Sequence, residues 1–186
     1  PINRIGIYVP GGNVPLISTV VMTVAIAKVA KVKQIVVVTP PDSEGKIAPQ
    51  MLAALEILGV NEIYKVGGAQ AIGALAYGTE TITPVDKIYG PGNAFVNEAK
   101  RQVYGTVGID LLPGPSELMV IADSSSNPAF VAAALLSQAE HGSGKEKIFL
   151  LFSEKSHFDK ITDQIDIQLQ TLSHKGAIEG VLNNGF

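Results

Sequence analysis

The chain has 186 residues, which is enough for one ordinary domain or two small ones. Its hydrophobic fraction of 46% and charged fraction of 17% exclude a disordered segment. The formal net charge of −3 argues against a nucleic-acid partner, which would require a surplus of Lys and Arg, and the absence of cysteine excludes disulfides, thiolate zinc sites and Cys nucleophiles.

One long apolar stretch is a candidate membrane segment. The stretch covers Val14–Ala27 and is interrupted by Ser18, Thr19 and Thr23. It is too short and too polar to span a bilayer core of about 30 Å. No secretory signal pattern precedes it. We therefore expect no membrane contact. We also expect a cytoplasmic location, although the sequence without cysteine neither requires nor excludes an oxidising compartment. The start at Pro1 rather than Met predicts that translation begins upstream.

Strand and helix patterns alternate along the first 112 residues. The β-branched run Gln34–Val38 is typical of a strand that is covered on both faces. The predicted strands are Ile5–Val9, Gln34–Val38, Glu62–Val66, Lys87–Tyr89 and Ile109–Leu112. The predicted helices are Leu16–Val32, Ile47–Leu58, Ala69–Tyr77 and Asn93–Tyr104.

A second, smaller unit follows. Asn127 before Pro128 is a typical helix start, with an N-cap residue and a proline in the first turn. The predicted strands are Leu118–Ala122 and Lys147–Phe152, and the predicted helices are Phe130–His141 and Glu154–Leu172. Strands that alternate with helices indicate parallel βαβ units. The fold class is therefore α/β, with a doubly wound parallel sheet and part of a second α/β domain.

Four strand-to-helix loops are candidate ligand sites, because ligands of open α/β sheets bind beyond the carboxyl ends of the strands. The loops are Tyr8–Gly12, Gly67–Gln70, Gly90–Asn93 and Pro113–Glu117. Their glycines allow a ligand to approach the backbone, and the helices that follow offer free N–H groups to anions. A plain scaffold whose Gly and Pro only form turns remains an alternative. The standard dinucleotide fingerprint G-x-G-x-x-G and the P-loop are both absent.

Gln138 and His141 lie three residues apart at the end of a predicted helix, so both fall on one face. Imidazole is a common transition-metal ligand, and an amide oxygen can assist it. Spacing alone leaves an alternative open, in which His141 interacts with the helix dipole next to the helix end at Gly142. A zinc site also needs about four ligands.

The other basic side chains show no sign of a site. His157 lies among polar residues of a helix, and His174 follows the last predicted helix. We expect both on the solvated surface. We also expect the pair Lys100 and Arg101 on a solvated helix face rather than in a phosphate clamp.

Taken together, the loops and the Gln138–His141 motif resemble the histidinol dehydrogenase family. The matching stretches are residues 6–12, 66–72, 85–96, 98–103, 114–117 and 136–142. They occur in the order of the family, whereas the chain after about residue 153 carries little of its signature. The resemblance implies an NAD-dependent and zinc-dependent oxidoreductase of histidine biosynthesis. This enzyme oxidises L-histidinol to L-histidine through the aldehyde and reduces two NAD.

The resemblance also implies roles for individual residues. Tyr8, Gln70 and Asn93 would contact NAD. Ser116 would contact substrate, and Gln138 and His141 would bind zinc and line the substrate pocket. The implied domains are a Rossmann-like NAD-contacting domain over residues 1–115 and a partial catalytic, zinc-binding domain over residues 116–186. The family assembles as a homodimer.

Other parts of the family pattern have no match here. The family chain is more than twice as long. Its remaining zinc ligands are an Asp and a C-terminal His, of which only the His comes from the partner subunit. Neither these ligands nor its acid–base Glu-His dipeptide has a counterpart after His141. We therefore assign no catalytic acid or base and expect a central segment of the enzyme that is inactive alone. The alternative is a non-catalytic nucleotide- or amine-binding module derived from the family. A reading frame that ends near Phe186 would favour the module, and one that continues to a Gly-Pro-Glu-His motif would favour the segment.

Overall fold

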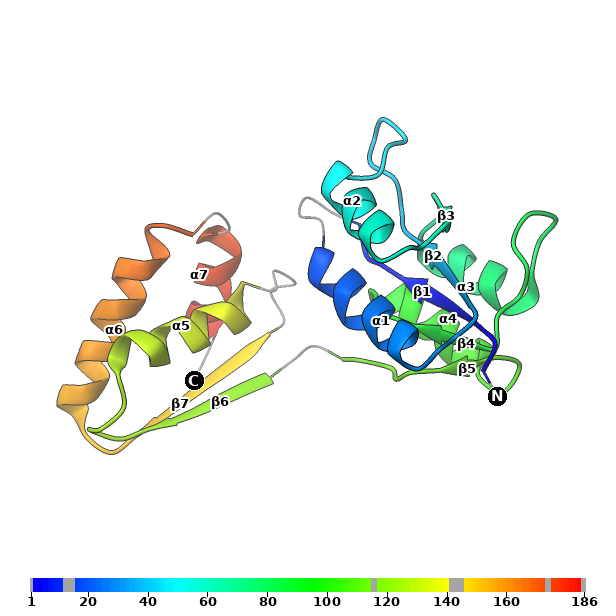
Figure 1. The fold of residues 1–186 in the computed structure, drawn as a ribbon. Helices are drawn as coiled ribbons and strands as arrows, with labels where there is room; N and C mark the ends of the chain where they lie inside the picture. The colour runs from blue at the N-terminus through cyan, green and yellow to red at the C-terminus, as the bar shows by residue number, and fades with distance from the viewer. Residues whose placement is uncertain (1, 12–15, 115–116, 141–145, 173–174, 185–186) are drawn as a thin grey trace. The chain divides into compact units, whose positions relative to one another are not determined.

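The computed structural model describes residues 2–11, 16–114, 117–140, 146–172 and 175–184. The chain forms two compact units, Pro1–Pro113 and Gly114–Phe186, each with its own sheet (Figure 1). The division expected from the sequence lay two residues further along, between residues 115 and 116. No helix among the described residues is long and apolar enough to cross a bilayer.

The first unit contains a five-stranded, all-parallel sheet in the order β3-β2-β1-β4-β5. Its strands are β1 (Arg4–Tyr8), β2 (Gln34–Val38), β3 (Glu62–Tyr64), β4 (Lys87–Tyr89) and β5 (Gly108–Ile109). Its helices are α1 (Ile17–Val29), α2 (Pro49–Ile57), α3 (Gly68–Tyr77) and α4 (Ala94–Val103). This strand order is that of a doubly wound, Rossmann-like sheet, so the predicted fold class is confirmed.

Helices cover both faces of this sheet (Figure 1). On one face, Ile5 and Ile7 of β1 belong to the core that includes residues of α1 and α2. On the other face, Tyr8 packs in a core with residues of α3 and α4. The backbone of Gly6 lies so close to α3 that an added Cβ would be 2.8 Å from both methyl carbons of Leu75. The alternation along β1 therefore directs Tyr8 toward α3.

The fifth strand is shorter than the predicted range Ile109–Leu112. Leu111 and Leu112 are 56% and 45% exposed, so they add nothing to the core. The chain leaves the sheet at Asp110, whose N–H still donates to the carbonyl of Ile88 at 3.1 Å. The carboxylate of Asp110 turns toward the end of β4, where it accepts a hydrogen bond.

The amino edge of the sheet is joined by Arg4, which lies at the start of β1. Its guanidinium pairs with Glu62 at the start of β3 and donates to Gln34 Oε1 of β2 at 3.3 Å. Its backbone N–H donates to Asp86 Oδ2, next to β4, at 2.9 Å. The hydrogen bonds from Arg4 hold the pKa of Glu62 below its ordinary value of 4.5. Arg4 thus connects four neighbouring strands at the edge opposite the candidate ligand loops.

The second unit contains β6 (Glu117–Ala122) and β7 (Lys147–Phe152), which pair in parallel. Its helices are α5 (Pro128–Ala139), α6 (Lys155–Leu169) and α7 (Lys175–Asn184). The predicted start of α5 is confirmed, because Asn127 Oδ1 accepts from Ala129 N at 2.9 Å. Helix α7 was not predicted. Two glycines, Gly176 and Gly180, weaken its helical pattern, although Ile178 and Val181 are buried at helical spacing.

The expectation that His157 lies on the solvated surface is wrong. The side chain is buried, with 5% of its surface exposed, and its Nε2 lies 2.8 Å from Ser126 Oγ. The single hydroxyl proton of Ser126 is donated to the carbonyl of Asp123 at 2.7 Å, so His157 Nε2–H is the donor in the pair. Ile161, one turn later, is fully buried, so both side chains face inward. His174 lies outside the described residues.

We expect Glu62→Gln to lower the melting temperature at neutral pH, because it removes the charge paired with Arg4. A carboxyl group with a lowered folded-state pKa stabilises the fold above its unfolded pKa and loses that contribution as the pH falls through the folded value. The difference from wild type should therefore shrink as the pH falls below 4.5 and vanish only below the lowered folded-state pKa of Glu62. Glu44→Gln is the control. It removes an ion pair with Lys46 in which both side chains are exposed, Glu44 at 70% and Lys46 at 72%, so it should change little at any pH. Equal effects of both variants would contradict the assignment.

We expect His157→Ala to destabilise the second unit by about 2 kcal/mol, because it removes a buried ring and its hydrogen bond to Ser126. Denaturant unfolding measures the change. Lys160→Ala, on an exposed position of the same helix, should stay within about 0.5 kcal/mol of wild type. If His157→Ala has the same free energy of unfolding as wild type, the burial of this ring does not stabilise the fold.

Candidate functional site

The loops after β1, β2 and β3 meet at the carboxyl edge of the first sheet. Pro40, just after β2, lies against the loops on both sides. A Cβ on Gly11, after β1, or on Gly67, after β3, would each lie 2.5 Å from a ring carbon of Pro40. Any larger residue at either position would displace the proline. The two glycines therefore let the three loops close on one another.

The loop after β4 reaches the same edge at Gly90. This residue has a φ of +117°, and an added Cβ would overlap the carbonyl oxygen of Tyr8. Only glycine permits this approach of the β4–α4 loop to the end of β1. In the order 3-2-1-4-5, β1 and β4 are the neighbours at which the chain reverses its direction of winding. Such a switch point is where open α/β sheets bind their ligands.

Tyr8 connects β1 to the start of α3. The residue is 4% exposed, and its hydroxyl accepts a hydrogen bond from the backbone N–H of Gly68 at 3.1 Å. Gly68 has a φ of +71° and is the first residue of α3. The phenolic oxygen thus accepts a backbone hydrogen bond, and the hydroxyl proton is the one donor of this side chain.

Gln70 lies in the first turn of α3 and is exposed. Its side chain bends back over Gly68, since a Cβ on that glycine would lie 2.8 Å from Gln70 Oε1. The amide of Gln70 and the hydroxyl of Tyr8 are thus both next to Gly68. The structure therefore brings these two sequence-predicted residues together.

Asn93 is the N-cap of α4. Its Oδ1 accepts from the backbone N–H groups of Phe95 and Val96, each at 3.1 Å. The amide nitrogen, Nδ2, is the remaining polar group of this exposed side chain. Asn93 follows Gly90 by three residues and lies at the same edge as Tyr8. That all three predicted NAD contacts line one cleft stays a prediction.

The expectation that Lys100 lies on a solvated face is wrong. Lys100 is 0% exposed, and its Nζ donates to the carbonyl of Gly90 at 3.1 Å and pairs with Asp110 Oδ1. The apolar neighbours Val96 and Val103, four residues before and three after Lys100, mark this as the buried face of α4. That spacing was the sequence signal for its burial.

The prediction of a solvated position is confirmed for Arg101, the next residue along the helix. Arg101 is exposed and pairs with Glu98 one turn earlier on α4. The Arg101 guanidinium lowers the pKa of Glu98 to about 2. The pair lies on the solvent side of the helix and contacts neither Gly90 nor Asp110 among the described hydrogen bonds.

Of the two residues predicted to bind zinc in the second unit, only Gln138 is among the residues that the structure describes. Gln138 is half-buried in the last turn of α5, which ends at Ala139 with Glu140 as the C-cap. The described helix thus stops before His141, which lies outside the described residues, as does Ser116. The described part of the chain contains no group of three or more His, Cys, Asp or Glu side chains that could hold a metal. An amide oxygen and an imidazole nitrogen suit a transition metal, but they make up only half of a four-ligand zinc site.

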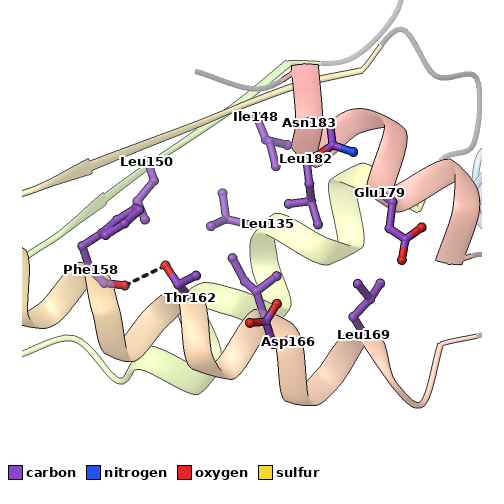
Figure 2. A pocket seen from close by; sticks show the side chains of 11 residues that line it. Leu135, Ile148, Leu150, Phe158, Thr162, Asp166, Leu169, Glu179, Leu182 and Asn183 are labelled. Carbon is purple, nitrogen blue, oxygen red and sulfur yellow. Dashed lines mark hydrogen bonds between the residues drawn. The ribbon is translucent and has the colours of Figure 1, made fainter.

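A cavity of about 570 Å³ lies within the second unit (Figure 2). Apolar side chains from β7, α5, α6 and α7 form most of its wall, and the carboxylates of Asp166 and Glu179 come from α6 and α7. The hydroxyl of Thr162 is used within α6, where it donates to the carbonyl of Phe158 at 3.1 Å. None of the sequence-predicted site residues lines this cavity.

Comparison with known proteins relates the whole chain to one family. A family model described as histidinol dehydrogenase matches residues 1–186. The histidinol dehydrogenase of Clostridium acetobutylicum is 50% identical over 183 residues, which are 98% of this chain and 42% of that protein. The Rhizobium meliloti protein of the same name is 54% identical over 172 residues, which cover 92% of this chain and 39% of the relative.

A solved structure supports the same relationship. The crystal structure of histidinol dehydrogenase from Elizabethkingia anophelis superposes with a TM-score of 0.94 at 46% sequence identity. The match covers 100% of this chain and 43% of that one, so the chain spans less than half the length of the relatives it matches. The family match over residues 1–186 and the shared fold show that this chain belongs to the histidinol dehydrogenase family.

Proposed function

We propose that this chain supplies the NAD-contacting domain and part of the zinc-binding domain of an enzyme that oxidises L-histidinol to L-histidine through the aldehyde. The relatives that support this activity carry the name histidinol dehydrogenase and are about half-identical to the chain. The observation that carries the proposal is the contact of Gly90 with Tyr8 at the switch point of the sheet. This contact brings the end of β1, which carries Tyr8, next to the loop that carries Asn93, and both residues are proposed NAD contacts.

The chemistry of these loops suits a ligand rich in hydrogen-bond acceptors. The oxygen of Asn93 is used as a helix cap, so this side chain offers its Nδ2 protons. The oxygen of Tyr8 accepts from Gly68, so this side chain offers its hydroxyl proton. Gln70 adds an exposed amide. The ribose and phosphate oxygens of NAD accept such bonds, which would replace the contacts of the absent glycine fingerprint. NAD, when bound, accepts the hydride.

The second unit would contribute to the substrate site. Gln138 and His141 would hold zinc, and Ser116 would contact substrate. Bound zinc would position the amine and imidazole of histidinol. This chain contains no Gly-Pro-Glu-His sequence, so the acid–base pair and the remaining zinc ligands would come from other parts of a longer, homodimeric and cytoplasmic enzyme. The non-catalytic module is not favoured, because the matched relatives are named as enzymes.

Asn93→Asp separates helix capping from NAD binding. Asp retains the capping oxygen but lacks the Nδ2 donors, so α4 should remain folded. In the full-length enzyme that contains this chain, we expect the KM for NAD to rise about tenfold, because a hydrogen bond to an anionic or polar ligand group is lost. Steady-state kinetics with histidinol measures the change.

The control for this variant is Asn127→Asp, the same exchange at the N-cap of α5. It should leave the KM for NAD unchanged, because it alters a cap in the second unit. If Asn93→Asp behaves like this control, the assignment of Asn93 to NAD is wrong.

His141→Ala tests the zinc assignment in the same full-length enzyme. We expect loss of bound zinc and a fall in turnover of more than about 100-fold, because the site loses its one imidazole from this chain. Metal analysis of purified protein measures the zinc content. His157→Ala is the comparison: it should lower stability through its contact with Ser126 while the folded protein retains zinc. Normal zinc content in His141→Ala would refute the assignment.

A further inference from the structure

We propose that Lys100 and Asp110 are positioning residues of the NAD site, which hold the β4–α4 loop against the end of β1. The inference rests on the proposed function, because it takes Tyr8 and Asn93 as NAD contacts. From the sequence, Lys100 was expected on a solvated helix face, and no role was expected for Asp110. Their role is deduced from what they bind within the first unit.

The two side chains fix both polar backbone groups of Gly90. The N–H of Gly90 donates to Asp110 Oδ2 at 2.8 Å. The carbonyl of Gly90 accepts from Lys100 Nζ at 3.1 Å, and the ion pair between Lys100 and Asp110 completes a closed ring of interactions. Residue 90 therefore has no freedom to rotate either of its peptide groups without breaking a charged hydrogen bond.

Lys100 acts through Gly90 rather than on a ligand. Its side chain is 0% exposed, whereas that of Asp110 is 19% exposed. A fully buried ammonium that already binds a carbonyl and a carboxylate has no surface to offer to NAD. Its effect on a ligand must pass through the backbone that it holds.

Stability alone does not account for this pair. Removing two charges from water costs free energy, and an apolar pair of similar volume often stabilises a fold as well or better. The ion pair instead fixes a direction, because each of its hydrogen bonds has a defined geometry. The carbonyl and N–H of Gly90 are held so that its Cα can lie against the Tyr8 carbonyl.

The position of Gly90 sets the proposed NAD contacts on both sides. Tyr8 is in direct contact with it, and Asn93 follows three residues later at the start of α4. Displacing a binding group by about 1 Å can cost a factor of about 100 in an enzyme. Release of the Gly90 loop should therefore weaken NAD binding without altering the zinc or histidinol site.

The test uses the double variant Lys100→Met/Asp110→Leu in the full-length enzyme. An apolar pair avoids the unpaired buried charge that either single exchange would leave. We therefore expect the melting temperature to fall less than in either single variant, with the remaining loss due to the two hydrogen bonds of Gly90. We expect the KM for NAD to rise about tenfold or more, with kcat, the KM for histidinol and the zinc content nearly unchanged, as for loss of a pure binding contribution. A wild-type KM for NAD in the folded double variant would overturn the proposal.

Two further variants complete the test. Lys100→Arg keeps the charge but not the geometry of the ammonium, so the enzyme should fold and still show a raised KM for NAD; an unchanged KM would overturn the proposal even if the double variant does not fold. The control is Glu98→Gln/Arg101→Gln, which removes the exposed ion pair of the same helix and should leave all constants unchanged.

The failure of this inference can be distinguished from that of the proposed function. A raised KM for NAD in Asn93→Asp, together with none in Lys100→Arg or the double variant, would overturn the positioning role alone. No change in Asn93→Asp would overturn the proposed NAD site and the positioning role with it.

Discussion

The contact between Gly90 and the carbonyl of Tyr8 is the constraint on which the carboxyl edge of the first unit depends. It requires a glycine with a φ of +117° at the end of β4, and it joins the two central strands where the winding of the sheet reverses. The helices after these strands pack on opposite faces of the sheet. A ligand at this point can therefore be reached by loops from both halves of the sheet, without the usual glycine fingerprint.

The first unit shows more of its proposed NAD site than the second unit shows of its proposed zinc site. In the first unit, helices cover both faces of the sheet, and Tyr8 and Asn93 have defined hydrogen-bond partners. In the second unit, β6 and β7 have one buried face, whereas Met119, Ile121 and Leu151 remain 55%, 78% and 51% exposed. Parallel sheets are normally covered on both sides. The zinc assignment there rests on the Gln138–His141 motif and the family relationship.

Apolar and turn-forming residues made most of the fold predictable. The β-branched run of β2 and the Gly-Pro turns after β1 and β4 identified strands and loops, and Asn127 with Pro128 identified the start of α5. The predictions that were wrong concern the exposure of two polar residues. Lys100 and His157 are charged or polar by type, but each lies on the inward face of its helix with a specific partner. Their partners, Asp110 and Ser126, lie 10 and 31 residues away in the sequence. The local sequence pattern therefore could not reveal these two contacts. The roles of Tyr8, Gln70 and Asn93 came from family motifs and not from periodicity.

A crystal structure of the full-length enzyme with NAD bound would test the proposed NAD site most directly. We expect NAD at the carboxyl edge of the first unit, with its oxygen atoms within hydrogen-bond distance of the Tyr8 hydroxyl, the Gln70 amide and Asn93 Nδ2. We also expect the Lys100–Asp110 pair to keep both bonds to Gly90 in that complex. NAD bound elsewhere, with the side chains of Tyr8, Gln70 and Asn93 free of contact, would contradict the proposed NAD site.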